Sequence, residues 1–289
     1  MALLLCVGFL SSQPASAVEE SITLSPPDKH FSVKAGETKT DELTVVNYGE
    51  VAYDFIVYTS PYSVKDSTYT PDFTTITDNG DAYKWIRFNQ TRWHAEPKQV
   101  VHVPYTLTVS KGAVAGGHYG VIFVETQPTG DQQGVARKKR LAMILYANVD
   151  GPTTTAGKVK SISSPWFQTT PPLRSDVSVE NTGKTDFSAK TKYVVKDLLG
   201  AVKFQTEKES VILPGTTRLI EHEWERPTWV GVYTMHTEAT VLGKLAVKDS
   251  IVIMAPKWLI FIALLALLVI VARAYSRNKT SPSKKTRNS

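Results

Sequence analysis

The histidine and carboxylate residues of this chain are scattered, and no group of them has the spacing of a metal site. The densest group is Glu221-His222-Glu223, where strand alternation would place both carboxylates on one face and the histidine on the other. Ligands that point in opposite directions cannot surround one ion. His222 and His236 are expected to face solvent, and we interpret all six histidines as surface residues: His30, His94, His102, His118, His222 and His236.

Catalytic motifs are also missing from the sequence. It contains no Gly-x-Ser-x-Gly elbow, phosphate-binding loop, Cys-x-x-Cys pair or paired-carboxylate signature. We therefore expect a protein that is not an enzyme and that has no catalytic residue, metal or cofactor. An enzyme is kept as a third hypothesis, because distant strands can bring carboxylates together. It would be supported by a cleft that holds clustered carboxylates with shifted pKa values.

The densest run of charge before the C-terminal tail consists of Arg137, Lys138, Lys139 and Arg140. The run falls between two predicted strands, so it is typical of a solvated hairpin loop whose charges discourage edge pairing. The alternative is a contact for an anionic wall polymer or for an acidic partner.

Tryptophan side chains are the other candidates for a contact surface. β-Sandwich cores take tryptophan readily, so most of these residues are expected to be structural. Trp166 follows Ser-Ser-Pro, and Trp229 lies in the segment Arg226-Pro-Thr-Trp-Val-Gly231. Either one is a candidate anchor for a sugar or a protein surface.

The elements that must position these residues are strands. Val101, Val103, Tyr105, Leu107 and Val109 alternate with polar residues, as in a half-buried strand, and residues 233–241 alternate in the same manner. Residues 119–124 are apolar on both faces, which indicates a central strand. Further strands are predicted at 43–46, 53–58, 141–149, 177–180, 193–195 and 251–253. No window before Ala255 sustains a 3.6-residue period, so this part of the chain is predicted to be all-β.

A weak internal repeat divides the strands into two sets. Residues 43–53 match residues 177–187 at a constant offset, and each copy places an Asn-x-Gly turn between two strands. The expected role of that turn is to tolerate positive φ. Between the copies, residues 150–157 have the Gly, Pro and Thr composition of a linker.

The stretch from Trp258 to Ala272 is uncharged, and it is followed by Arg273 and Tyr275. With a snorkelling Arg273, a helix here is roughly 27 Å long, which is enough to cross the hydrocarbon core. Trp258, Arg273 and Tyr275 are its predicted interfacial anchors. Basic residues without any acidic one follow the stretch, so the positive-inside rule places the tail in the cytoplasm and the preceding chain outside.

The basic character of the chain belongs to this C-terminal region. Seven of the 33 basic residues, and none of the 27 acidic ones, lie from Lys257 onward, which leaves 26 basic and 27 acidic residues before it. The pI of about 9.2 therefore does not indicate a basic binding surface, and nucleic acid is not an expected partner.

The predicted organisation has five parts. Residues 1–17 read as a signal peptide that ends in Ala-Ser-Ala, with an uncleaved anchor as the alternative. Two immunoglobulin-like β-sandwiches follow at 18–150 and 151–255, and then a transmembrane helix at 256–275 and a basic cytoplasmic tail at 276–289. The one cysteine, Cys6, lies in the signal segment, so the sandwiches are expected to depend on their cores rather than on disulfides.

This organisation resembles the WxL-interacting proteins of bacterial surfaces, whose first domain belongs to the DUF916 (WxL peptidoglycan-binding) family. The resemblance lies in residues 31–39 and 43–47, Trp85-Ile-Arg-Phe88, the strand 101–109, and Gly116-Gly-His-Tyr-Gly-Val-Ile-Phe123. It covers most of residues 20–150. It implies peptidoglycan binding by the first domain and protein binding by the second, and it assigns no binding residues.

The main interpretation is a non-enzymatic, single-pass surface protein of the plasma membrane that binds or scaffolds a cell-wall polymer, a secreted surface protein, or both. The second hypothesis is a membrane-tethered, chaperone-like assembly protein that works by strand donation. The enzyme described above is the third.

Overall fold

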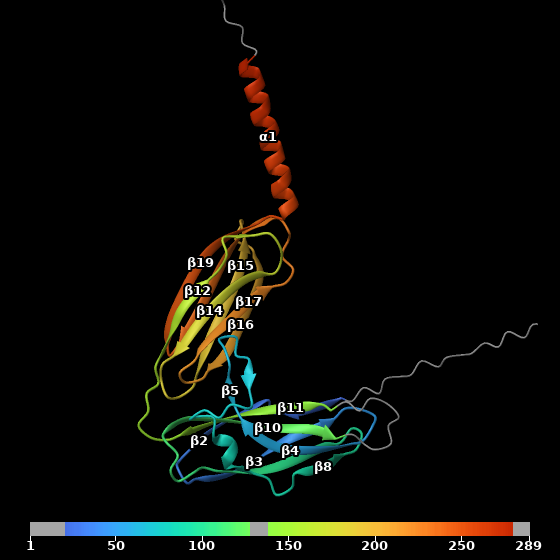
Figure 1. The fold of residues 1–289 in the computed structure, drawn as a ribbon, viewed down its shortest axis with the longest axis vertical. Coiled ribbons are helices and arrows are strands. Elements are labelled where there is room, and N and C mark those ends of the chain that lie inside the picture. Colours follow the sequence, from blue (N-terminus) through green and yellow to red (C-terminus); the bar gives the residue numbers. More distant parts are fainter. Residues whose placement is uncertain (1–20, 128–137, 280–289) are drawn as a thin grey trace, which may run out of the picture. The chain divides into compact units, whose positions relative to one another are not determined.

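A computed structural model describes residues 21–127 and 138–279 of the chain. The predicted signal peptide, Arg137 and most of the predicted tail lie outside these residues. The predicted fold class is confirmed: the chain forms two immunoglobulin-like β-sandwiches followed by one helix (Figure 1). The described residues before that helix contain strands and one short 3₁₀ turn, Ala82–Trp85.

Two compact units make up the chain. Unit 1 comprises Met1–Ser63 and Pro71–Gly151, and unit 2 comprises Val64–Thr70 and Pro152–Ser289. Unit 2 is therefore discontinuous in sequence. Within it, the Tyr69 hydroxyl accepts a hydrogen bond from the Leu213 amide at 2.8 Å, and the Arg218 guanidinium lies over the Tyr69 ring.

Unit 1 is a sandwich of two antiparallel-rich sheets. The four-stranded sheet has the order β1 (Ile22–Ser25), β3 (Thr38–Asn47), β9 (Val100–Thr108) and β7 (Ile86–Arg87). The five-stranded sheet has the order β2 (Asp28–Val33), β11 (Arg140–Val149), β10 (Gly116–Gln127), β4 (Tyr53–Pro61) and β8 (Arg92–Ala95). A separate ribbon joins β5 (Ser63–Val64) to β6 (Pro71–Asp72).

Alternation along the strands builds the core of unit 1, as the sequence predicts. In β9, Val101, Val103, Tyr105 and Leu107 all point inward and are buried. The predicted central strand β10 is buried on both faces from Gly116 to Val124. Its outer face is covered by aromatic rings; Phe123, for example, packs edge-on against Phe73 with 4.9 Å between ring centroids.

Unit 2 repeats the sandwich with a different distribution of strand lengths. Its three-stranded sheet has the order β12 (Gly157–Ser163), β14 (Leu173–Asn181) and β17 (Thr217–Trp224). Its five-stranded sheet has the order β13 (Phe167–Gln168), β19 (Lys244–Met254), β18 (Gly231–Val241), β15 (Phe187–Asp197) and β16 (Val202–Ile212). The predicted alternation in β18 is confirmed, because Tyr233, Met235, Thr237, Ala239 and Val241 are all buried.

The Asn-x-Gly repeat is a buried side-chain anchor in each unit. Asn47 ends β3, and its amide nitrogen donates to the carbonyl groups of Val51, Ala95 and Glu96 at 2.9–3.2 Å. Its side-chain oxygen accepts the Gly49 amide at 2.9 Å.

In unit 2, Asn181 makes the equivalent bonds to Thr185, Ile212 and Gly183. The expected reason for the motif was wrong, because neither Gly49 nor Gly183 is among the residues with positive φ. The asparagine amide, and not a left-handed glycine, holds each turn.

The final element is α1, which runs from Lys257 to Lys279. Its segment Lys257–Ser276 is long and apolar enough to cross a membrane, and none of that segment is buried in the protein. This agrees with the predicted span at 256–275. Trp258 and Tyr275 are exposed on it, and their role as interfacial anchors stays a prediction.

We expect the substitution Asn47→Ala to destabilise unit 1 by about 3 kcal/mol, because it leaves buried backbone groups without partners. The measurement is urea unfolding of the detergent-solubilised chain. Asn148→Ala is the matched control, since Asn148 is an exposed asparagine in the same unit, and its effect is expected to stay within about 0.5 kcal/mol. Equal effects of the two substitutions would contradict the anchoring role.

Candidate functional site

Two of the six histidines are buried, which corrects the expectation that all of them face solvent. His222 lies on the inward face of β17, and its Nε2 is 2.8 Å from the Thr191 hydroxyl. His118 is held between Asp81, at 2.6 Å, and the Val114 carbonyl, at 2.8 Å. Alternation correctly placed Glu221 and Glu223 on the face opposite His222, but it did not decide which of the two faces is the core.

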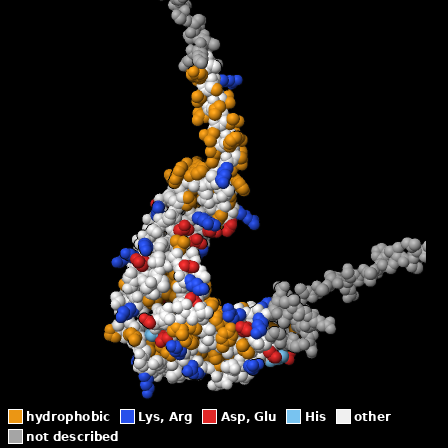
Figure 2. All heavy atoms as spheres, viewed as in Figure 1, with side chains coloured by type: hydrophobic (Ala, Val, Ile, Leu, Met, Phe, Trp, Pro, Cys, Tyr) orange, Lys and Arg blue, Asp and Glu red, His pale blue; other side chains and the backbone are white. Residues whose placement is uncertain are grey.

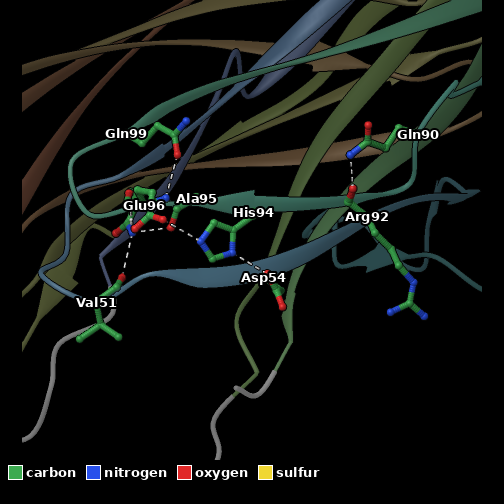
Figure 3. Close-up of polar contacts among 9 residues, drawn as sticks. Val51, Asp54, Gln90, Arg92, His94, Ala95, Glu96 and Gln99 are labelled. Carbon is green, nitrogen blue, oxygen red and sulfur yellow. Dashed lines mark hydrogen bonds and ion pairs between the residues drawn. The ribbon is translucent and has the colours of Figure 1, made fainter. Parts of the chain in front are cut away.

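The remaining histidines form surface ion pairs. His94 on β8, for example, contacts the Asp54 carboxylate at 2.7 Å (Figure 3), and this hydrogen bond is the main cause that raises the pKa of His94. Among residues 21–127 and 138–279, no group of three or more histidine, cysteine or acidic side chains is arranged to hold a metal ion.

The described residues of the basic run, Lys138, Lys139 and Arg140, all contact other residues of unit 1. Lys138 contacts the Glu125 carboxylate at 3.4 Å, and the Arg140 guanidinium lies 4.6 Å from the centroid of the Phe123 ring. Glu125 also accepts the Tyr58 hydroxyl at 2.9 Å, the first cause that lowers the pKa of Glu125. Lys139 donates its backbone amide to Thr126. Lys138 and Arg140 therefore serve the hairpin itself, and Arg137 lies outside the described residues.

One carboxylate has the kind of pKa shift that the enzyme hypothesis requires. The pKa of Asp176 on β14 is raised, first by burial and next by the negative charge of Glu221, which lies directly opposite it on β17. These residues lie on the open face of a sheet, and neither lines the two hollows described in unit 2.

The tryptophans separate into two groups. Trp85 is buried in unit 1, and Trp93 and Trp224 pack against the cores of their units. Trp166 and Trp229, the two candidates for exposed anchors, are 73% and 57% exposed. Both lie at the end of unit 2 from which the chain continues into α1. The Trp166 carbonyl accepts a hydrogen bond from the Ile253 amide, near the end of β19. Trp229 lies two residues before Gly231, which pairs with Met254, the last residue of β19.

The edges of the five-stranded sheet of unit 2 differ in their chemistry. The edge strand β16 carries Lys203, Glu207, Lys208 and Glu209. Charged side chains of this kind protect an edge from pairing with another chain. At the other edge, β19 is covered by β13 only at Ile253 and Met254, so no strand of the described chain pairs with Lys244–Val252 on that side.

In unit 1, a longer stretch of the corresponding edge is paired with another strand. There β2 runs parallel to β11 and pairs with six residues, Ile144–Val149. In each unit the first stretch of chain contributes one strand to each sheet. In unit 1, β1 pairs with β3 and β2 pairs with β11. In unit 2, β12 pairs with β14 and β13 pairs with β19. Because β13 is only two residues long, unit 2 leaves open more of this edge than unit 1 does.

The register shows which backbone groups of β19 face the open side. Ile253 donates its amide to Trp166, away from β18. Successive residues of a strand direct their N–H and C=O groups to alternate sides, and the β18–β19 pairing has no bulge. Leu245, Val247, Asp249 and Ile251 therefore present both backbone groups to the open edge. The two-residue turn at Leu242 and Gly243, where both residues have positive φ, fixes this register.

The side chains of the same residues form an apolar row on the outer face of the sheet. Leu245 is 61% exposed, Val247 47%, Ile251 63% and Ile253 42%. The row is interrupted by Asp249, which pairs with His236 at 2.6 Å. An open edge and an exposed apolar row thus coincide on one strand. We call Lys244–Val252 of β19 the open edge.

Only part of this site could be read from the sequence. Residues 251–253 were predicted as a strand, but Lys244–Ser250 were not. The available signal was the alternation of Leu245, Val247, Ile251 and Ile253, yet alternation would have assigned that row to the core. The core face of β19 is instead the other one, which carries Val252 and Met254.

Comparison with known proteins finds no matching family model and no matching curated protein. Similar solved structures include the Escherichia coli chaperone DraB, at 11% identity and a TM-score of 0.37 over 81% of this chain and 97% of that one. The CsuC–CsuE chaperone–tip adhesion subunit complex of Acinetobacter baumannii Csu pili matches at 11% identity and a TM-score of 0.39, over 80% and 98%.

The PapD-like domain of human CEP192 matches at 17% identity and a TM-score of 0.34, over 53% of this chain and 98% of that one. The sandwich assignment for the present chain rests on its own strand pairing, and these similarities add nothing about its function.

The buried His222 makes the stability of unit 2 depend on pH. Burial, and next the charge of Lys208, lower its pKa from 6.5 to about 4. Between these values the unfolded chain binds a proton that the folded chain does not, so folding loses stability as pH falls from about 6.5 towards about 4. In unit 1, burial of His118 is outweighed by its bonds to Asp81 and Val114, which raise its pKa, so its contribution to the stability of unit 1 has the opposite sign.

We expect His222→Gln to remove this dependence, since glutamine keeps a polar group near Thr191 but does not titrate. From about pH 7.5 to about pH 5 the wild type should lose about 2 kcal/mol more stability than the variant. Urea unfolding at the two pH values measures the difference, in which the contribution of His118 cancels. Parallel pH profiles for the two proteins would refute the assignment.

Proposed function

We propose that this chain is a membrane-anchored binding protein that captures an extended segment of a secreted partner by pairing it with the open edge of β19. The observation that carries the proposal is the coincidence of unpaired backbone groups and an exposed apolar row on one strand. Backbone N–H and C=O groups at a sheet edge are satisfied specifically by another strand, and alternate side chains add selectivity. The proposal is of the chaperone-like class.

The chemistry expected of the captured segment follows from the outer face of the sheet. A strand added beside β19 would place every second side chain next to Leu245, Val247 and Ile251, so apolar residues at alternate positions are favoured. Near the middle, Asp249 would favour a basic or hydrogen-bonding residue. The partner is therefore a polypeptide with an exposed, alternating strand, such as a subunit that lacks one of its own strands.

The helix gives this binding its location. Basic residues gather at the C-terminal end of α1, among them Arg273, Arg277 and Lys279. We place that end in the cytoplasm by the positive-inside rule and the sandwiches on the outer face of the membrane. A tethered protein of this kind would hold its partner near the bilayer during export or assembly.

The interpretation as a wall-binding protein of the WxL-interacting type stays a second proposal. The contacts of Lys138 with Glu125 and of Arg140 with Phe123 weaken the case for an anionic polymer at the basic run, because both cations already have partners. Binding to purified peptidoglycan sacculi distinguishes this proposal from strand capture.

We expect Val247→Pro to abolish capture of the partner while leaving unit 2 folded. The Val247 amide faces the open edge, so proline removes one donor from that edge and none from the ladder with β18. Loss of the donor, together with the clash of the ring with an added strand, should weaken binding by at least about ten-fold. The matched control is Val247→Thr, which keeps both the amide and the β-branched shape.

The measurement is a pull-down with the full chain in lipid nanodiscs, using the secreted proteins of the producing cell and, in parallel, purified sacculi. A secreted protein that is retained by the wild type and by Val247→Thr but not by Val247→Pro supports strand capture. Equal retention by all three proteins, or retention on sacculi alone, would exclude the open edge as the binding site. Near-ultraviolet circular dichroism checks that the variants are folded.

A further inference from the structure

The end of unit 2 that continues into α1 carries exposed apolar loops. Five residues from three separate segments contribute, with exposures of 94% for Leu199, 75% for Leu198, 73% for Trp166, 57% for Trp229 and 53% for Val230. We call these five residues the apolar crown. Figure 2 shows hydrophobic side chains gathered at this end of unit 2.

Strand register brings the three segments together. Asp197, Tyr233 and Val252 form a row across β15, β18 and β19. Asp197 is the last residue of β15, so Leu198 and Leu199 extend beyond that row. Trp229 and Val230 immediately precede Gly231, the partner of Met254. The Trp166 carbonyl accepts the Ile253 amide at 2.9 Å. All five residues therefore lie at the end of the sheet where β19 stops.

The short connection between β19 and α1 indicates what the apolar crown contacts. β19 ends at Met254, and α1 begins at Lys257. Three residues span at most about 10 Å, so this end of unit 2 stays next to the bilayer surface whatever angle the helix takes. Exposed apolar loops elsewhere on the protein would carry a risk of aggregation, but loops at this end lie close enough to the bilayer to contact its lipids.

The residue types and charges suit the interfacial region of a membrane. Tryptophan is enriched at the headgroup level, and leucine adds apolar area that can lie below it. The acidic side chain of Asp197 is paired with Lys203 at 3.0 Å, which is the main cause that lowers its pKa. Arg226 and Lys257 add positive charge that can approach lipid phosphate groups.

A hollow of about 500 Å³ opens at the same end. Its walls include Leu198, Leu199, Trp224 and Val232, with Arg226 and Lys203 at the polar side. Asp197 also lines the hollow and is paired with Lys203, so Arg226 is the cation beside the apolar walls that can approach a lipid phosphate. The hollow thus extends the surface that the apolar crown offers to lipid.

We propose that the apolar crown inserts into the interfacial layer of the bilayer, so that unit 2 makes a second membrane contact besides its helix. The contact would restrict the swing of unit 2 about residues 255–257. It accounts for the exposure of Trp166 and Trp229 without a sugar or protein ligand. It does not depend on capture of a partner by β19.

The test uses the full chain with Cys6→Ser, reconstituted in vesicles of phosphatidylcholine and phosphatidylglycerol. Single cysteines introduced by Leu199→Cys and Trp229→Cys carry an environment-sensitive fluorophore. The matched control is Leu242→Cys, an exposed apolar position in the β18–β19 turn at the opposite end of the sheet. Should one crown variant fail to fold, Leu198→Cys and Val230→Cys provide the same readout.

We expect the crown labels to show blue-shifted emission and to lose about half or more of their fluorescence to spin-labelled acyl chains, because interfacial insertion reaches about 5–10 Å into the bilayer. The label at position 242 should be unaffected. Crown labels as water-exposed as that control would overturn the proposal. Labels that are shielded from aqueous iodide but not quenched by spin-labelled lipid would overturn it too, since they would indicate a protein occupant.

Discussion

Every backbone N–H and C=O group in a sheet needs a hydrogen-bond partner. In each unit of this chain, the first stretch of chain gives one strand to each sheet, and the length of its second strand decides how much of one sheet edge is paired. In unit 1 that second strand, β2, covers six residues of β11. In unit 2 the corresponding β13 covers two residues of β19. No strand among residues 21–127 and 138–279 pairs with the remaining edge groups of β19. The length of one short strand thus decides how much of the edge is covered in each unit.

The side chains around this edge agree with its backbone. Natural edge strands are commonly protected by charge, and β16 at the opposite side of the same sheet follows this rule with its lysines and glutamates. β19 follows it only in part: it carries Lys244, Lys248 and Asp249, but Leu245, Val247 and Ile251 are exposed on its outer face. Retaining apolar residues at an open edge carries an aggregation cost, which favours a role for them in binding.

The sequence predicted the fold class and most long strands because their apolar residues alternate with polar ones. It could not predict the burial of His222, since alternation shows that two faces differ but not which one is covered by another sheet. The same limit hid the open edge, where the row Leu245, Val247, Ile251 resembles a core row. The Asn47 and Asn181 anchors were found as a repeat, but their role depends on carbonyl groups from distant strands, such as Ala95 and Ile212. Trp166 and Trp229 were recognised from their loops, whereas Leu198 and Leu199 gave no separate signal.

The strand with the open edge, β19, ends at the end of unit 2 that carries the apolar crown, and this arrangement limits how the protein can work. β19 runs from the open edge to Met254 without a break, and Lys257 begins the span three residues later. At about 3.3 Å per residue, Val247 lies no more than about 35 Å along the chain from the start of the helix. A segment paired at Val247 would therefore stay within that distance of the start of the helix. Contact of the crown with lipid would restrict motion about the two connecting residues, 255 and 256, so that the open edge would meet its partner at a defined height above the bilayer.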